Sequence, residues 1–197
     1  ANFAWLQHMI HHLSPNGKIG MVLANGSLSS QSGGEGTIRE NILKADLVEC
    51  IVAMPSQLFY STQIPVCLWF LNRAKKQPGK VLFIDARNMG SMVTRKLREF
   101  TEEDILKIAG TYDAYVTGTL EDEKGYCAVV GMDEIEKQDY ILTPGRYVGI
   151  TETEDDGEPF QEKMERLTGE LSELFAKSHE LEAEIKKQLA SIGFTIK

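Results

Sequence analysis

Four short apolar runs, each of strand length, constrain this chain more than any other feature. They cover Lys18 to Ala24, Val48 to Met54, Pro65 to Leu71 and Lys80 to Ala86. Runs that are apolar at nearly every position are typical of strands buried on both faces of a sheet. The sequence therefore predicts an α/β fold built around a buried sheet.

The connections between the runs predict the strand directions. Between the first two runs, Thr37 and Glu40 have the spacing of a capping box, and a helical apolar stripe continues to Leu47. A helix between two strands makes a βαβ unit, so the first two strands should form a parallel pair with a right-handed crossover. Residues 55–64, which join the second run to the third, show no helical pattern. The third strand should therefore run antiparallel beside its predecessor.

Further elements surround the four runs. Residues 1–13 have helical apolar spacing, and Thr101 caps a helix that continues to about Tyr115. A short run at Cys127 to Val130 and a helical turn at Asp133 to Lys137 follow, and Pro144-Gly145 ends the globular pattern. Residues 1–150 therefore read as one domain.

The C-terminal part has a different character. Residues 151–158 carry five carboxylates and no large apolar side chain, which predicts a solvated acidic linker. In 159–197, apolar residues recur at alternating spacings of three and four, with the polar Ser178 and Gln188 in the same stripe. This pattern predicts a long coiled-coil-like helix that packs on a partner, on a second copy or on its own domain.

Composition limits the possible functions. A formal net charge of −8 argues against binding nucleic acid without a local basic patch or a basic partner. The longest apolar runs are strand-sized, so we expect no membrane span. The cysteines Cys50, Cys67 and Cys127 lie in apolar contexts without a C-x-x-C pair, which predicts buried reduced thiols in a cytoplasmic protein.

The usual catalytic, cofactor and metal patterns are incomplete. The loop Gly33-Gly34-Glu35-Gly36 has Arg39 where a dinucleotide fingerprint needs its last glycine, so a flexible loop over a sheet edge is favoured. His8, His11 and His12 lack a carboxylate in their helix that could complete a metal site. Asp85 and Asp104 are explained by a strand end and a helix dipole. We predict no catalytic, cofactor-binding or metal-binding residue here.

The stretch SQLFYSTQIP, residues 56–65, carries the strongest candidate residues, Phe59 and Tyr60. A structural interpretation is that Leu58 and Phe59 cap the sheet and Tyr60 is a surface turn residue. A functional interpretation follows from position, because open α/β sheets bind ligands in loops after the carboxyl ends of strands. There, an aromatic face could stack on a planar group such as a nucleobase.

Six separated motifs resemble one known family. They are the helix FAWLQHMIHHL, GKIGMVLANGSL, EGTIRENIL, LVECIVAMPSQLFYSTQIPVCLWFLNR, GKVLFIDAR with FTEEDI, and TPGRYV. In this order they resemble the methylation subunit of type I restriction-modification systems, adenine-N6 DNA methyltransferases that use S-adenosylmethionine. The resemblance covers about residues 1 to 150.

The resemblance implies a Rossmann-like sheet whose last strand is antiparallel, with the first three runs as its last three strands. It also implies that Phe59 stacks on the flipped adenine, with Tyr60 beside it. Family members carry their methyl-donor loop and an Asn-Pro-Pro-aromatic motif earlier in the chain, and neither occurs here. The sequence is therefore expected to be the C-terminal portion of the subunit and inactive in isolation.

The family also implies partners, namely a specificity subunit, a restriction subunit and double-stranded DNA bound through the complex. The C-terminal helix fits contact with the specificity subunit. Two other interpretations remain open: a non-catalytic interaction module or decayed remnant, and an RNA methyltransferase fragment, which should lack TPGRYV and the helical tail. An Asn-Pro-Pro-aromatic motif upstream of Ala1 would favour the enzyme.

Overall fold

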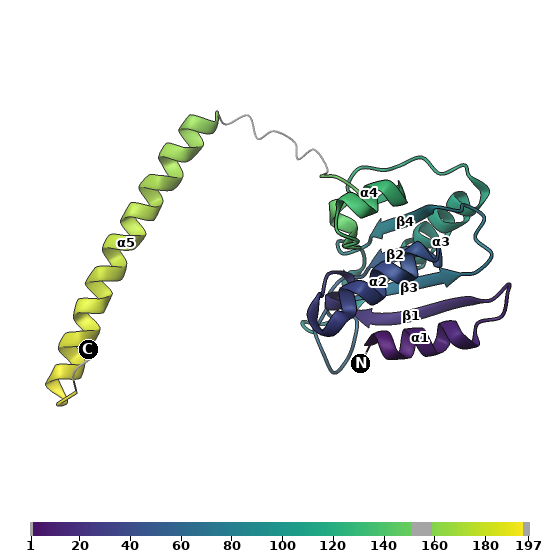
Figure 1. The fold of residues 1–197 in the computed structure, drawn as a ribbon. Coiled ribbons are helices and arrows are strands. Elements are labelled where there is room, and N and C mark those ends of the chain that lie inside the picture. The colour runs from purple at the N-terminus through teal and green to yellow at the C-terminus, as the bar shows by residue number, and fades with distance from the viewer. Residues whose placement is uncertain (1, 151–158, 195–197) are drawn as a thin grey trace. The chain divides into compact units, whose positions relative to one another are not determined.

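The computed structural model describes residues 2–150 and 159–194, and the chain divides into two compact units, Ala1–Thr151 and Glu152–Lys197 (Figure 1). The predicted acidic linker, residues 151–158, lies outside the described residues. The first unit holds the sheet and the second holds one long helix.

A five-stranded mixed sheet forms the centre of the first unit, in the order β1-β3-β2-β4-β7. Its strands are β1 (Lys18–Ala24), β2 (Val48–Ala53), β3 (Val66–Asn72), β4 (Lys80–Asp85) and β7 (Cys127–Gly131). Strand β3 is antiparallel to both β1 and β2, β2 is parallel to β4, and β7 is antiparallel to β4. Strands β1, β2 and β4 consequently end at the same edge of the sheet, which we call the carboxyl edge.

This topology confirms most of the expected strand arrangement. The four apolar runs are strands, and β3 pairs antiparallel with β2, with Ile51 opposite Trp69. The prediction that β1 and β2 pair with each other is wrong, because β3 lies between them and bonds to both. The two strands still run in the same direction, as a helix crossover requires. The fold is mixed α/β with a mostly antiparallel sheet.

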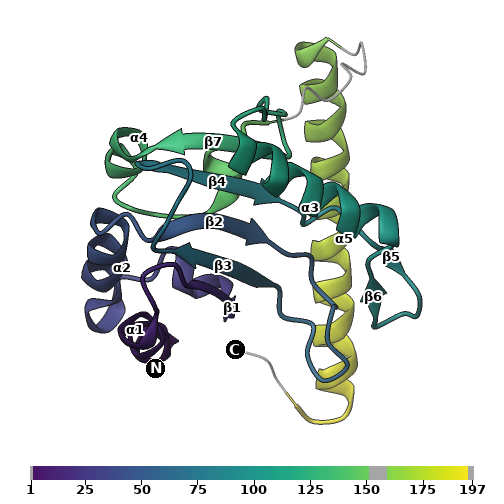
Figure 2. The ribbon, with the colours of Figure 1, turned by 90° about the vertical axis from the view of Figure 1, so that its right-hand side faces the viewer.

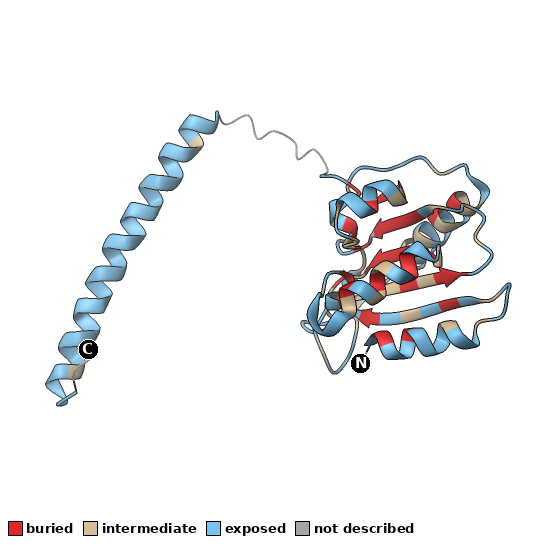
Figure 3. Ribbon diagram, viewed as in Figure 1, coloured by how far each residue is buried: buried red, intermediate tan, exposed pale blue. Residues whose placement is uncertain are grey.

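Helices cover the two faces of the sheet unequally (Figures 1 and 3). The helices α1 (Asn2–His12), α2 (Glu35–Lys44) and α4 (Met132–Lys137) pack on one face, over a core that includes Trp69 and Phe83. Helix α3 (Glu102–Thr117) packs on the other face, over a second buried cluster that includes Tyr115 and Val52. Strand β2 is buried along its whole length because it lies between both layers.

The helix starts show one success and one error of sequence interpretation. At α3, Thr101 Oγ1 accepts a bond from Asp104 N (3.1 Å) and the Asp104 carboxylate accepts one from Thr101 N (2.9 Å), so the predicted capping box is confirmed. At α2 the predicted box at Thr37 is wrong. The helix starts at Glu35 and its N-cap is Gly34, whose φ of +81° suits glycine.

Short elements complete the first unit. They are the 3₁₀ turns η1 (Asn25–Leu28), η2 (Ser32–Gly34) and η3 (Pro144–Arg146), and the hairpin strands β5 (Ser91–Met92) and β6 (Arg98–Glu99). The packed structure extends past Pro144-Gly145, where it was expected to end, because Tyr147 stacks on Phe83 with ring centroids 4.1 Å apart and Val148 is buried. All three cysteines are buried and unpaired, as predicted.

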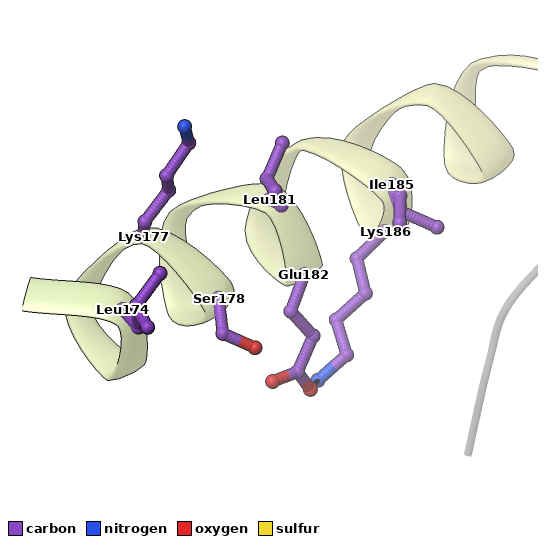
Figure 4. Close-up of a pocket in the computed structure, with 7 residues that line it drawn as sticks. All are labelled: Leu174, Lys177, Ser178, Leu181, Glu182, Ile185 and Lys186. Carbon is purple, nitrogen blue, oxygen red and sulfur yellow. Dashed lines mark hydrogen bonds and ion pairs between the residues drawn. The ribbon is translucent and has the colours of Figure 1, made fainter. Parts of the chain in front are cut away.

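The second unit is helix α5 (Phe160–Ser191), in which no side chain is buried. Its large apolar side chains stay exposed: Met164, Leu167, Leu171, Leu174, Leu181 and Ile185. Figure 4 shows Leu174, Leu181 and Ile185, with Ser178 between the first two and Glu182 paired to Lys186. Pairing of this stripe with another helix remains a prediction. No helix in the described part of the chain is long and apolar enough to cross a bilayer.

Candidate nucleic-acid interface at the carboxyl edge

Three connecting segments meet at the carboxyl edge, after β1, β2 and β4 (Figure 2). Residues 25–34, 54–65 and 86–98 contain no Asp or Glu but four basic residues, Arg87, Arg95, Lys96 and Arg98. The whole chain, by contrast, has 29 acidic and 21 basic residues. The edge is thus a region where a polyanion meets little repulsion from the connecting segments.

Residues 54–65, here named the aromatic loop, bring Phe59 and Tyr60 to this edge. Phe59 is 39% exposed and Tyr60 is 93% exposed. The loop turns at Gln57, whose φ is +68°, and its amide bonds across the loop to Gln63 O at 3.4 Å. Two aromatic faces therefore stand open beside the end of β2. Their stacking on a base remains a prediction.

A small hollow of about 270 Å³ lies at the same edge. Asn25, Ala53 and Arg87, from the ends of β1, β2 and β4, contribute to its lining. Arg87 pairs with Asp85 through Nε (2.8 Å) and Nη2 (2.6 Å), and these bonds raise the pKa of the Arg87 guanidinium. Asp85, expected to be simple strand-end polarity, therefore holds a basic side chain in place.

The loop that follows β1 is held by Arg39, a residue that sequence interpretation missed. Arg39 is fully buried and donates from Nε to Tyr140 O (2.7 Å) and from Nη1 to Ser30 O (2.8 Å) and Ser27 O (3.4 Å). Burial lowers the pKa of this guanidinium. A signal existed in the sequence, since Arg39 precedes Ile42 and Leu43 by three and four positions and so shares their buried face. These bonds clamp the loop at Ser27 and Ser30, and the flexibility expected of Gly33-Gly34-Glu35-Gly36 stays a prediction.

A larger apolar hollow, about 560 Å³, lies between α3 and the faces of β1, β2 and β3. At one end, Tyr112 donates to Glu49 Oε2 (2.6 Å) and accepts from Lys18 Nζ (2.9 Å). Burial, then the bond to Glu49, raises the pKa of Tyr112. Lys18 begins β1, so this polar group lies at the edge opposite the aromatic loop and does not join it.

The other candidate groups form no site with the aromatic loop. The His8 and His12 rings contact each other on α1, with centroids 4.6 Å apart. Among the residues that the structure describes, no three His, Cys, Asp or Glu side chains are placed to hold a metal. The Asp104 carboxylate serves the α3 cap, and the bonds from Thr101 lower the pKa of Asp104.

The described residues do not fit a complete S-adenosylmethionine site. Nucleotide ligands of Rossmann sheets are held by a close backbone turn after one strand and by a carboxylate about 20 residues further on that bonds the ribose, and the ribose of S-adenosylmethionine can be bonded in the same way. Here Gly33 and Gly34 face open space, β2 ends at Ala53, and the Asp85 carboxylate is already taken by Arg87. No step of a reaction can be assigned to this cofactor from these residues.

Comparison with known proteins decides the family. A model of the N-6 DNA methylase family matches residues 1–156. The chain belongs to the N-6 DNA methylase family. The resemblance to type I methylation subunits inferred from the six motifs is confirmed.

Curated relatives of the chain include type I methylase subunits. The chain is 61% identical over 195 residues to the type I restriction enzyme HindI methylase subunit of Haemophilus influenzae, and 44% identical over 199 residues to the MjaIX methylase subunit of Methanocaldococcus jannaschii. These matches cover 98% of this chain but 44% and 35% of the relatives. The chain thus spans less than half the length of these relatives.

Solved structures of methylase subunits have the same fold. The methyltransferase subunit of a type I restriction-modification system from Streptococcus thermophilus matches with a TM-score of 0.69 at 30% identity, over 77% of this chain and 30% of that one. The EcoKI M protein matches with a TM-score of 0.60 at 20% identity, over 98% of this chain and 47% of its own. The second match bears on the fold alone.

Proposed function

We propose that residues 1–150 form the C-terminal part of the catalytic domain of a type I methylase subunit. The subunit would transfer a methyl group from S-adenosylmethionine to adenine N6 in DNA. The carrying observation is the match of residues 1–156 to the N-6 DNA methylase family. Strands β1, β2 and β4 would belong to a Rossmann-like sheet, with β3 as its antiparallel strand, an assignment supported by their common direction.

The aromatic loop would hold the target base. An extruded adenine presents a flat face, and stacking on an aromatic side chain contributes about 1 to 3 kcal/mol per base without regard to sequence. Phe59 is held at the carboxyl edge with part of its surface exposed, and Tyr60 stands beside it. These features suit Phe59 as the stacking residue and Tyr60 as its neighbour.

The remaining machinery would come from outside this segment. The methyl donor and the group that holds the target amino nitrogen would be bound by other residues of the full-length subunit, so residues 1–197 alone would be inactive. Through α5 the subunit would bind a specificity subunit, and the assembly would include a restriction subunit and double-stranded DNA. The three unpaired buried cysteines suit a cytoplasmic location.

The decisive experiment measures adenine methylation. The full-length subunit that carries residues 1–197, assembled with its specificity partner, should transfer labelled methyl groups from S-adenosylmethionine to duplex DNA. Phe59→Ala should lower this rate by about tenfold or more, the range that corresponds to the loss of one stacking contact. Phe59→Trp should keep most of it, because the replacement retains an aromatic face.

A base analogue separates stacking from general damage. With 2-aminopurine at the target position, the wild-type assembly should raise its fluorescence on binding, and Phe59→Ala should change that signal. The matched control is Ile64→Ala, an exposed apolar residue of the same loop. A complex that binds DNA but never methylates adenine contradicts the proposed activity. Equal methylation rates for Phe59→Ala and wild type contradict the stacking role of Phe59 but not the proposed activity.

A further inference from the structure

The hairpin β5–β6 presents two basic side chains in a fixed turn. Its tip is closed by bonds from Val93 N and Thr94 N to Leu97 O (3.0 and 3.3 Å). Thr94 Oγ1 accepts from the amides of Lys96 (3.2 Å) and Leu97 (3.0 Å). The side chains of Arg95 and Lys96, at the centre of this turn, are exposed. The backbone that carries both cations is therefore ordered by its own hydrogen bonds.

The same hairpin is bonded directly to the aromatic loop. Arg98 N donates to Gln57 O (2.8 Å), and Gln57 Nε2 donates to Arg95 O (3.4 Å). Gln57 lies two positions before Phe59 in the chain. Figure 2 shows the hairpin and the loop after β2 on the same side of the sheet. The turn that carries both cations is therefore anchored to the aromatic loop.

The guanidinium of Arg98 is bonded within the protein, at the base of the hairpin, whereas Arg95 and Lys96 are exposed at its tip. Arg98 Nη1 donates to Met89 O (3.0 Å) and Gly90 O (2.9 Å), so its guanidinium is used to hold the chain after β4. Gly90 has a φ of +76°, and a Cβ there would lie 2.8 Å from Glu99 O. Only glycine fits this close crossing of β5 and β6.

The local charge favours an anionic ligand. Arg95 and Lys96 form no ion pair with any residue in the described ranges. The carboxylates closest in sequence are Glu99, at the end of β6, and those in the first turn of α3, where Asp104 is bonded to Thr101. No acidic residue lies in 86–98 or in the aromatic loop. Two exposed cations on a turn bonded to the aromatic loop suit a nucleic-acid strand, in which every nucleotide has a phosphate for a cation and a flat base for an aromatic ring.

We propose that Arg95 and Lys96 contact backbone phosphates of the DNA strand that carries the target base, next to the base held at Phe59. The inference rests on the proposed function, because it takes DNA as the ligand. Contacts of this kind position the strand and carry no sequence information. The hairpin would thus add affinity and placement while the specificity partner reads the sequence.

The test is the salt dependence of DNA binding by the assembled methyltransferase. Each phosphate contact adds about 0.9 to the slope of log K against log salt. Arg95→Ala with Lys96→Ala should therefore reduce the magnitude of the slope by about 2. The variant should bind cognate and unrelated duplexes more weakly by the same factor. Arg95→Gln with Lys96→Gln should change the slope and the affinity as the double alanine variant does. Thermal unfolding checks that both variants fold.

A matched control removes the same charge elsewhere. Lys76 and Lys80 are exposed and lie at the turn between β3 and β4, at the opposite edge of the sheet. Lys76→Ala with Lys80→Ala should leave the slope unchanged. An unchanged slope in both hairpin variants overturns the inference, as does an equal change in the control. A wild-type assembly that binds DNA without methylating it contradicts the proposed function. The salt slopes of its variants would still show whether Arg95 and Lys96 contact phosphates.

Discussion

Arg39 shows how one buried charge fixes a loop at the candidate site. Its guanidinium bonds to backbone oxygens from two segments distant in sequence, at Ser27 and Ser30 and at Tyr140. A buried charge is costly unless its donors are satisfied. Here Nη2 is buried without a hydrogen-bond partner among the described residues, so the guanidinium is only partly hydrogen-bonded. The three bonds stabilise one conformation of residues 25–34, and the desolvation of the guanidinium reduces the net stabilisation that they give.

Replacing Arg39 should therefore be strongly destabilising. Arg39→Met keeps an unbranched apolar stem but removes the guanidinium and leaves three backbone oxygens without their donor, so we expect the free energy of unfolding to fall by about 2 to 4 kcal/mol. Urea unfolding followed through the buried Trp69 measures this change. Arg39→Lys should recover part of the loss. A loss below about 0.5 kcal/mol for Arg39→Met would show that the clamp contributes little.

Tyr147 gives a prediction that depends on pH. Its ring stacks on Phe83, its hydroxyl donates to Ile141 O, and burial raises the pKa of Tyr147 to about 12. The folded state therefore keeps this proton when the unfolded chain, with a pKa of about 10, loses it. The contribution to stability is complete below pH 10 and is lost as the pH rises from 10 through 12.

Tyr147→Phe isolates that contribution. At pH 7 the variant should be less stable than wild type by about 1 kcal/mol, since it lacks the bond to Ile141 O. Between pH 9 and pH 12 the gap should narrow, because wild type loses the proton-linked stability that the variant never had. Urea unfolding at both pH values measures it, and a gap that widens with pH would contradict the assigned direction.

At the scale of elements, the strands could be predicted from the sequence but their order could not. Each apolar run identifies its strand, and the short connection predicts that β3 runs antiparallel to β2. Nothing local shows that β3 also pairs with β1, because that pairing is formed by residues such as Leu23 and Cys67, which are far apart in the chain. Hydrophobic periodicity reports burial and not the neighbour that provides it.

The candidate site was predictable to a similar extent. Phe59 and Tyr60 stand out as aromatic residues in a polar connection after a strand, and the structure brings both to the carboxyl edge. The clamp at Arg39 and the hairpin contact at Gln57 depend on backbone atoms that any residue could supply. The spacing of Arg39 to Ile42 and Leu43 indicates that its side chain is buried. However, the backbone oxygens that it bonds, and the backbone contact at Gln57, leave no mark on residue type and could not be read from the sequence.

The two capping boxes provide a direct test of this distinction. Thr101 and Thr37 have nearly the same local pattern, yet only Thr101 bonds to a helix amide in the cap. Thr101→Ala should lower the free energy of unfolding by about 1 kcal/mol. Thr37→Ala should change it by less than about 0.5 kcal/mol, because Thr37 is an exposed residue inside α2. Urea unfolding of both variants decides the matter, and equal losses would contradict the observed helix start.

At the scale of the whole molecule, the two units differ in the surface that they expose. The connecting segments after β1, β2 and β4 lack carboxylates, while α5 has an exposed apolar stripe flanked by ion pairs such as Arg166 with Glu170 and Glu182 with Lys186. An apolar stripe in water loses the stabilisation that burial would give. These features support the proposed contact of the first unit with DNA and the proposed pairing of α5 with another helix.

The last prediction concerns what covers that stripe. In the full-length subunit, Leu171→Lys with Leu181→Lys places two charges in the seam and should abolish co-purification with the specificity subunit, as deletion of 159–197 should. The matched control, Ser172→Lys with Ala183→Lys, adds the same charge at exposed positions off the stripe and should leave assembly intact. Helical content measured by circular dichroism should be similar in both. If the seam variant still assembles but sediments at half the wild-type mass when no partner is present, the stripe pairs two copies of the subunit instead. If it assembles and keeps its mass, neither partner binds the stripe, and packing on the subunit's own first unit is the explanation left.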